Sequence, residues 1–151
     1  MTTFRFVHPI EIRYADLDPQ RHVNNVAVFT YLESARARYL QHLGLWDGVD
    51  FDSIGIILAE ASCRYLAPIV YGQPIEVALA VTRLGTKSLT LDYAVRDSSS
   101  RAELATARTL LVAYDYLRGE SIVIPADWRK AIQAFEGMPD EGSNGPVIRD
   151  V

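Results

Sequence analysis

Apolar and polar residues alternate along most of the second half of the chain, and this pattern constrains the fold more than any other feature. The alternation starts near residue 57, pauses at turn-forming stretches such as PIVYGQP and DSSSR, and continues to about residue 116. A two-residue period is that of a β-strand with one buried face. We therefore expect strands at residues 57–65, 75–81, 89–95 and 104–116, and a short one at SIVI, residues 121–124. Because tight turns join them, these strands should pair antiparallel.

The segment from Val26 to Leu43 has helical spacing instead. Its apolar residues fall three or four apart and cover more than one face of the predicted helix: Val28, Phe29, Tyr31, Leu32, Ala35, Tyr39, Leu40 and Leu43. Such a helix must be surrounded by other structure, and a curved sheet can surround it. We therefore predict an α+β fold in which a curved antiparallel sheet wraps around a long central helix.

Shorter elements flank this core. Ile10, Ile12 and Tyr14 alternate with charged residues and predict a first strand at residues 9–14, while ADWRKAIQAF predicts a short amphipathic helix. We expect a single domain at residues 1–137 and a flexible, polar tail at residues 138–151. An open sheet leaves unpaired edges, so we also expect a homodimer, and a dimer of dimers.

Composition excludes several classes of function. A net charge of -4 provides no general attraction for nucleic acid or anionic lipid, and we expect neither as a partner. The single cysteine, Cys63, permits no internal disulfide and has no CxxC partner for zinc. The first residues lack the pattern of a signal peptide, and no apolar run is long enough for a membrane helix. We therefore expect a cytoplasmic protein without a metal or a cofactor.

The stretch DLDPQRHVNN, residues 16–25, places polar groups directly before the apolar helix. The N-terminus of a helix offers free backbone N–H groups and the positive end of the helix dipole, which together can hold a developing oxyanion. Asp18 lies on the approach to this point, and the dipole favours its ionised form. This pattern is typical of a site that attacks a carbonyl group or activates water against it.

Simpler roles exist for the same residues. Asp16 is interpreted as a capping residue, and Asn24 caps the helix in the simplest reading. His22 is either a structural hydrogen-bonding residue or a functional one. On the helix, Glu33 could act as a base, but we expect it to pair with Arg36.

The segment RYADLDPQRHVNNVAVFTYLESARARYL resembles the opening of the hotdog-fold acyl-CoA thioesterases, in the branch of the 4-hydroxybenzoyl-CoA and bacterial short-chain acyl-CoA enzymes. It is also similar to the HVNN segment of the plant acyl-ACP thioesterases. The strands RYLAPIVYGQPIEVALAVTRLGTKSLTLDYAV and LATARTLLVAYD extend the likeness over roughly residues 5–136. Gln20 departs from the acyl-ACP enzymes, which have asparagine there, so that side chain's role is not carried over.

The resemblance implies a thioesterase that hydrolyses an acyl-CoA to a carboxylic acid and free CoA. It places Asp18 at the catalytic carboxylate, as nucleophile or general base, the backbone N–H of Asn25 at the carbonyl-polarising donor, and His22 at the histidine of the HVNN motif. The substrate is expected to contact residues at the helix start and at the basic turn: Asn24, Val26, Arg83, Lys87 and Ser88. An acyl-carrier-protein thioesterase and a non-catalytic acyl-CoA binding or regulatory module remain the alternatives.

Overall fold

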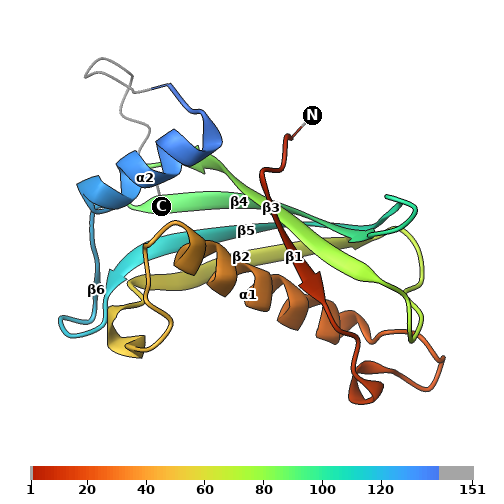
Figure 1. The fold of residues 1–151 in the computed structure, drawn as a ribbon. Helices are drawn as coiled ribbons and strands as arrows, with labels where there is room; N and C mark the ends of the chain where they lie inside the picture. The colour runs from red at the N-terminus through yellow and green to blue at the C-terminus, as the bar shows by residue number, and fades with distance from the viewer. Residues whose placement is uncertain (1, 140–151) are drawn as a thin grey trace.

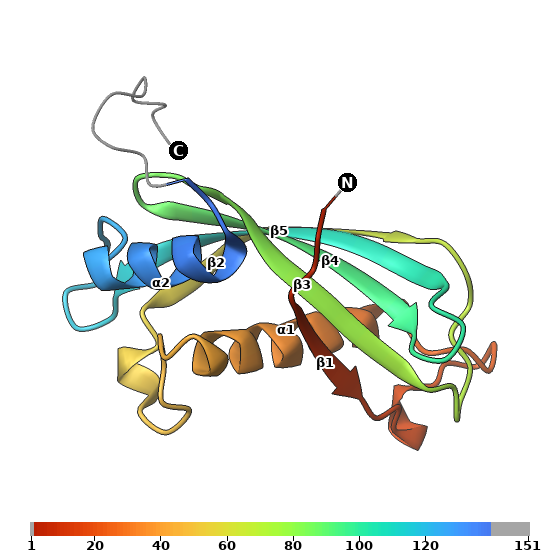
Figure 2. The same cartoon turned by 45° about the horizontal axis from the view of Figure 1, so that its top comes forward.

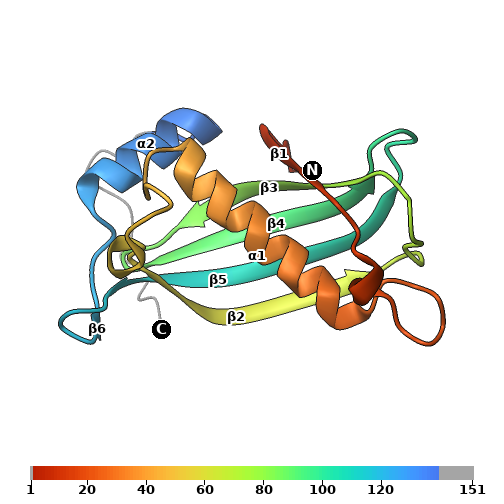
Figure 3. The same ribbon diagram turned by 60° about the horizontal axis from the view of Figure 1, so that its bottom comes forward.

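A computed structural model describes residues 2–139 of the chain (Figure 1). Its elements are β1 (Phe6–Ile10), α1 (Asn25–His42), β2 (Ile56–Tyr65), β3 (Ile75–Leu84), β4 (Ser88–Asp97), β5 (Glu103–Asp115), β6 (Glu120–Ser121) and α2 (Ala126–Glu136), with short 3-10 helices at Tyr14–Asp16 and Phe51–Ser53. The antiparallel sheet has the strand order β1-β3-β4-β5-β2, and β6 pairs with β5. The sheet curves around α1, which lies across its concave face (Figure 3). The predicted fold class is confirmed.

The two faces of the sheet differ in character because alternate residues point to opposite sides. One row, Tyr93, Ala107 and Cys63, lies on the inner face that looks toward α1. The neighbouring row, Asp92, Arg108 and Ser62, lies on the outer face. The apolar core fills the space between the inner face and the buried residues of α1, which are Val28, Tyr31, Leu32, Ala35, Tyr39 and Leu40.

The element boundaries follow the sequence pattern closely, with three exceptions. The short strand expected at residues 121–124 is wrong, because β6 spans only Glu120–Ser121. The helix begins and ends one residue earlier than expected, and Gly44 follows its end with a φ of 71°. The predicted strand at residues 9–14 is wrong, because β1 spans Phe6–Ile10 and the chain then turns. The Asp16 carboxylate accepts hydrogen bonds from the backbone and side chain of Arg13, which stabilises that turn.

The helix lies on one side of the sheet (Figure 2) and crosses it diagonally, from the end of β3 beside α2 to the end of β2 (Figure 3). β2 is an edge strand, and most of its residues are exposed. Leu58 is 48% exposed and Tyr65 is 40% exposed. A bulge between Leu58 and Glu60 shifts the alternation along this strand. An exposed edge with apolar side chains is a surface on which a second chain can pair.

The second helix closes the end of the sheet where α1 finishes. One oxygen of Glu136 accepts hydrogen bonds from the Tyr39 hydroxyl at 2.6 Å and from the Val81 backbone N–H at 3.1 Å. Burial raises the pKa of this carboxyl. The contact ties α2 to both α1 and β3. Beyond it, the predicted tail at residues 138–151 lies outside the described residues except for Met138 and Pro139. No helix within residues 2–139 has the length and hydropathy to span a membrane.

Candidate active site

The polar motif forms a narrow hairpin that leads directly into α1. Leu17 and Val23 pair across it, and the Asp18 N–H donates to the His22 carbonyl at 2.8 Å. At the tip, the Arg21 N–H donates to the Asp18 carbonyl at 3.0 Å and closes a β-turn with proline at its second position, where proline is favoured. Arg21 then adopts a φ of 66°, a left-handed conformation that is costly for a residue with a side chain. The motif therefore has one defined shape.

Asp18 stabilises this hairpin with one of its two carboxylate oxygens. Oδ1 accepts from the backbone N–H of Gln20 at 2.9 Å and from that of His22 at 3.3 Å. No residue within 2–139 donates a hydrogen bond to Oδ2. One oxygen thus holds the turn, and the other remains available to a substrate or a water molecule. The half-buried His22 ring makes no recorded hydrogen bond to the described residues, although its backbone is bound to Asp18 on both sides.

Asp16 has a structural role, as interpreted from the sequence. It is 4% exposed and binds the Arg13 guanidinium at 2.9 Å and the Tyr31 hydroxyl of α1 at 2.7 Å. Burial by itself would raise the pKa of Asp16, but these hydrogen bonds outweigh burial and hold the pKa below its ordinary value. The Asn24 N–H donates to the Asp16 carbonyl, and the Val23 N–H to the Ile69 carbonyl, both at 2.8 Å. The hairpin is therefore bound to the helix and to the chain that follows β2.

The start of α1 leaves one backbone donor free. The Asn24 side chain caps the helix by accepting from the Val26 N–H at 2.9 Å, and the Asn24 carbonyl accepts from the Ala27 N–H at 2.9 Å. The Asn25 N–H has no recorded acceptor in the described part of the chain, as expected at a helix N-terminus. The Tyr65 hydroxyl of β2 donates to the Asn25 carbonyl at 2.8 Å and fixes this turn against the sheet. Burial raises the pKa of Tyr65 to about 12, so its hydroxyl remains protonated.

The cap leads to a prediction for Asn24, which was also expected to contact the substrate. Asn24→Ala should lower the free energy of unfolding by about 1 kcal/mol, because the Val26 N–H loses its acceptor. Asn24→Ser should keep the stability, since serine also caps helices. Urea unfolding measures both. A raised KM in the stable serine variant would show that the side chain also binds substrate, and an unchanged stability of Asn24→Ala would contradict the capping role.

The basic turn lies at the opposite end of the sheet from the hairpin. Arg83, Lys87 and Ser88 surround the β3–β4 turn, where Ser88 pairs with Val112 near the start of β2. The motif hairpin and Tyr65 lie at the other end of β2. Lys87 contacts the Ser121 hydroxyl at 3.4 Å, and Ser88 is 7% exposed. One protomer therefore does not bring these residues to Asp18.

Glu33, the carboxylate on α1 that could act as a base, does not have the partner expected for it. Glu33 is exposed, and the predicted pair with Arg36 is wrong, because Arg36 is buried and donates to the Tyr93 hydroxyl at 3.2 Å. Within residues 2–139, no group of three or more His, Cys, Asp or Glu side chains is arranged to hold a metal ion.

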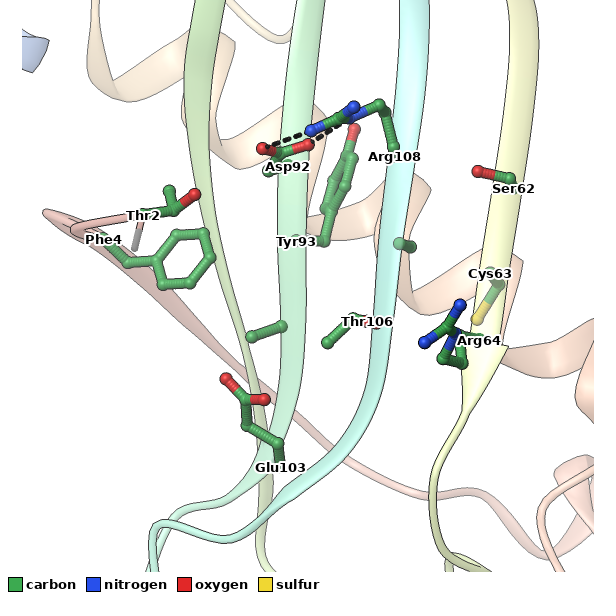
Figure 4. A pocket seen from close by; sticks show the side chains of 12 residues that line it. Thr2, Phe4, Ser62, Cys63, Arg64, Asp92, Tyr93, Glu103, Thr106 and Arg108 are labelled. Atoms are coloured by element: carbon green, nitrogen blue, oxygen red, sulfur yellow. Dashed lines mark hydrogen bonds and ion pairs between the residues drawn. The ribbon is translucent and has the colours of Figure 1, made fainter.

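Two hollows are found on the outer face, away from the motif. One, of about 610 Å³, extends from Phe4 across Asp92 and Arg108 to Arg64 (Figure 4). The Arg108 guanidinium and the Asp92 carboxylate bind each other there at 2.6 Å. The other, of about 440 Å³, includes Arg83. Neither hollow includes a residue of the motif. The candidate catalytic residues therefore do not lie in these hollows, although both are large.

A family model described as the thioesterase-like superfamily matches residues 12–132, which include the motif, α1 and every strand of the sheet except β1. The chain belongs to the thioesterase-like superfamily. A thioesterase from Thermus thermophilus, whose crystal structure contains coenzyme A and Zn, is 30% identical to this superfamily member. The two structures align with a TM-score of 0.80 over 92% of this chain and 100% of the other. The sheet wrapped around α1 is thus the hotdog fold, as the resemblance implied.

Two further proteins are similar to this superfamily member. The PA5185 protein of Pseudomonas aeruginosa PAO1 is 30% identical and aligns with a TM-score of 0.78 over 88% of this chain and 92% of the other. The Bacillus subtilis (strain 168) protein YsmA is 27% identical over 92 residues, which span 61% of this chain and 61% of that protein.

Two contacts could not be predicted from the sequence. The alternation predicts Tyr65 only as the end of a strand, although its hydroxyl holds the first turn of α1. The second contact is that of Arg36, a residue apart from the motif that was expected on the surface of the helix. Its position three residues from Glu33 favoured a surface pair, whereas its place among Leu32, Ala35 and Tyr39 indicated a buried face.

Proposed function

We propose that the protein is an acyl-CoA thioesterase, in which residues 1–137 form one catalytic domain. The observation that carries this proposal is the pairing of an unused backbone donor with an anchored carboxylate. The Asn25 N–H has no recorded acceptor among residues 2–139, and Asp18 lies on the hairpin that leads into the same helix turn. The coenzyme A in the Thermus thermophilus relative supports CoA as the thiol part of the substrate.

In the proposed reaction, the thioester oxygen accepts a hydrogen bond from the Asn25 N–H, which stabilises the oxyanion that forms. Asp18 acts by one of two routes. As a nucleophile, its free oxygen attacks the carbonyl carbon, the C–S bond breaks, and water hydrolyses the resulting mixed anhydride. As a general base, Asp18 takes a proton from water, whose oxygen attacks the carbonyl carbon and displaces the thiolate. His22 positions Asp18 through the backbone contacts that join the two residues.

We further propose that the active unit is a homodimer joined along β2, and that two such dimers assemble. A two-fold axis that pairs the exposed β2 edges antiparallel brings one protomer's basic turn to the end of the sheet where the partner's motif lies. Arg83, Lys87 and Ser88 would then meet the CoA bound at the other protomer's Asp18. Asn24 and the exposed Val26 would line the entry to the acyl site.

Thiol release from a panel of acyl-CoAs tests this function. We expect the protein to release CoA from at least one acyl-CoA and to act less well on the matching acyl-pantetheine, which lacks the nucleotide phosphates. The reverse preference, or activity only on acyl-carrier protein, would favour a carrier-protein thioesterase. If calorimetry showed binding of acyl-CoAs but no thiol were released from any of them, the protein would be a non-catalytic binding module.

A further inference from the structure

A buried polar cluster lies between α1 and the inner face of the sheet, apart from the motif. Arg36 is 9% exposed, and its guanidinium donates to the Tyr93 hydroxyl at 3.2 Å. Tyr93 lies 2.9 Å from the Thr109 hydroxyl, and each of these residues is 2% exposed. The three residues come from α1, β4 and β5 in a region otherwise filled by apolar side chains.

The cluster has more hydrogen-bond donors than acceptors. A guanidinium carries five N–H donors, and the two hydroxyl groups add one each, against only two hydroxyl oxygens that accept. Arg36 makes no ion pair with a carboxylate of residues 2–139. The neighbouring carboxylates are oriented elsewhere, because Glu33 is exposed and Asp92 binds Arg108 on the outer face. Among the described residues, the one buried side-chain nitrogen or oxygen without a partner is Arg96 Nε, so the guanidinium N–H groups of Arg36 that make no hydrogen bond reach the surface. A ligand can meet them there, and an anion would complete the pairing of this cation.

The inner face beside the cluster is lined by small side chains. Ala107 and Cys63 follow Tyr93 in its row across β5 and β2, and Ala61 pairs with Thr109. Ala61 is exposed, because it lies in the middle of the edge strand β2. In the proposed dimer, an acyl chain that runs from Asn25 along the inner face beside β2 therefore passes small side chains on its way to the cluster.

The distance from the candidate active site to the cluster follows from the strand register. Tyr65 contacts Asn25 at the helix start, while the rows of Tyr93 and Thr109 lie two and four residues further along β2. At the rise of a strand, these rows are about 7 and 13 Å away. A medium-length acyl chain covers this distance, whereas an acetyl group does not.

We propose that Arg36, supported by Tyr93 and Thr109, binds a carboxylate at the far end of the acyl chain. The preferred substrates are then CoA monothioesters of medium-length dicarboxylic acids. A carboxylate complements the guanidinium because it accepts two parallel N–H bonds and supplies the missing negative charge. Arg36 is thus a specificity-determining residue. The inference rests on the proposed thioesterase function for the reaction, but the binding of the carboxylate can be measured separately.

The test compares acyl-CoAs that differ only at the far end: succinyl with butyryl, adipoyl with hexanoyl, and suberoyl with octanoyl. In wild type, the ratio of kcat/KM for the carboxyl-terminated to the methyl-terminated substrate should reach roughly tenfold or more in the longer pairs, as for a charged hydrogen bond. Arg36→Met, which keeps an unbranched side chain but removes the guanidinium, should reduce that ratio to about one or below. The matched control is Arg38→Met on the exposed side of the helix, where Arg38 donates to the Gln41 side chain at 3.2 Å, and it should keep the wild-type ratio.

Each other outcome is decisive. A wild-type ratio of kcat/KM near one in every pair overturns the proposal, and this result does not depend on whether Arg36→Met folds. An Arg36→Met variant that folds and keeps the wild-type ratio overturns it as well. Calorimetry with S-(7-carboxyheptyl)-CoA and S-octyl-CoA, which cannot be hydrolysed, separates this inference from the reaction. Tighter binding of the carboxyl compound by wild type but not by Arg36→Met would support the carboxylate site even if no thioester were cleaved. If wild type bound the two thioether compounds equally and hydrolysed both suberoyl-CoA and octanoyl-CoA, only the role of Arg36 would be refuted, and the thioesterase function would stand.

Discussion

Asp18→Asn is expected to lower kcat by at least ~100-fold, the lower range for loss of a catalytic base or nucleophile, while the protein stays folded. The structure makes this substitution specific. In Asp18, Oδ1 accepts from the Gln20 and His22 N–H groups, and an asparagine oxygen can accept the same two bonds. The hairpin is therefore preserved while the negative charge and the basicity are lost. The measurement is thiol release under saturating substrate, together with thermal unfolding.

Asp47→Asn is the matched control for this experiment. Asp47 lies beyond the other end of α1, and its Oδ1 accepts from the backbone N–H groups of Val49 at 2.7 Å and Asp50 at 2.9 Å. The same change in the same kind of turn should leave kcat near wild type. If both variants lost activity equally, the loss would come from a less stable turn and not from the missing catalytic carboxylate. If Asp18→Asn kept full activity, Asp18 would be a turn residue alone, and the proposed mechanism would fail.

Two inactive variants are expected to restore activity when their protomers are mixed. In the proposed dimer, each site takes Asp18 from one protomer and Arg83 with Lys87 from the other. A mixed dimer of Asp18→Asn and the double variant Arg83→Ala/Lys87→Ala then contains one complete site. After unfolding and refolding together, half of the dimers are mixed and half of their sites are complete, so the rate should be about a quarter of wild type.

The readout is kcat/KM at low substrate, where loss of contacts to the CoA phosphates has its largest effect. Each variant refolded alone provides the baseline. Light scattering checks that the mixture and the single variants have the same mass. A mixture no more active than the sum of its parts would place both groups of residues in one protomer's site, or remove Arg83 and Lys87 from it.

The large elements could be predicted from the sequence because their hydrophobic periods are long and regular. The helix from Asn25 to His42 and the four long strands needed only the spacing of apolar residues. The first strand could not be placed in this way, because Ile12 and Tyr14 continue the alternation after β1 has ended. The strand ends at Ile10 because its partner there, Ile75, is the first residue of β3, a pairing that no periodicity reveals.

The site was predictable where its residues are neighbours in the chain and not where they are distant. The motif contains its own turn, cap and helix start, so local chemistry predicted a polar turn that carries Asp18 and leads into α1. The separation of Arg83 from Asp18 depends on which strands pair and in which direction. The contact of Arg36 with Tyr93 joins residues 57 positions apart, and only the register of the sheet brings them together.

The buried contact between Asp16 and Tyr31 has a consequence for the motions of the site. Many enzymes carry their reactive groups on loops that open independently of the core. Here the hairpin cannot detach without breaking the bond of Asp16 to Tyr31, which would leave the Tyr31 hydroxyl unpaired in the interior. The backbone amides of the hairpin should thus belong to the same cooperative unit as α1, and the site should lose its order only when the domain itself unfolds.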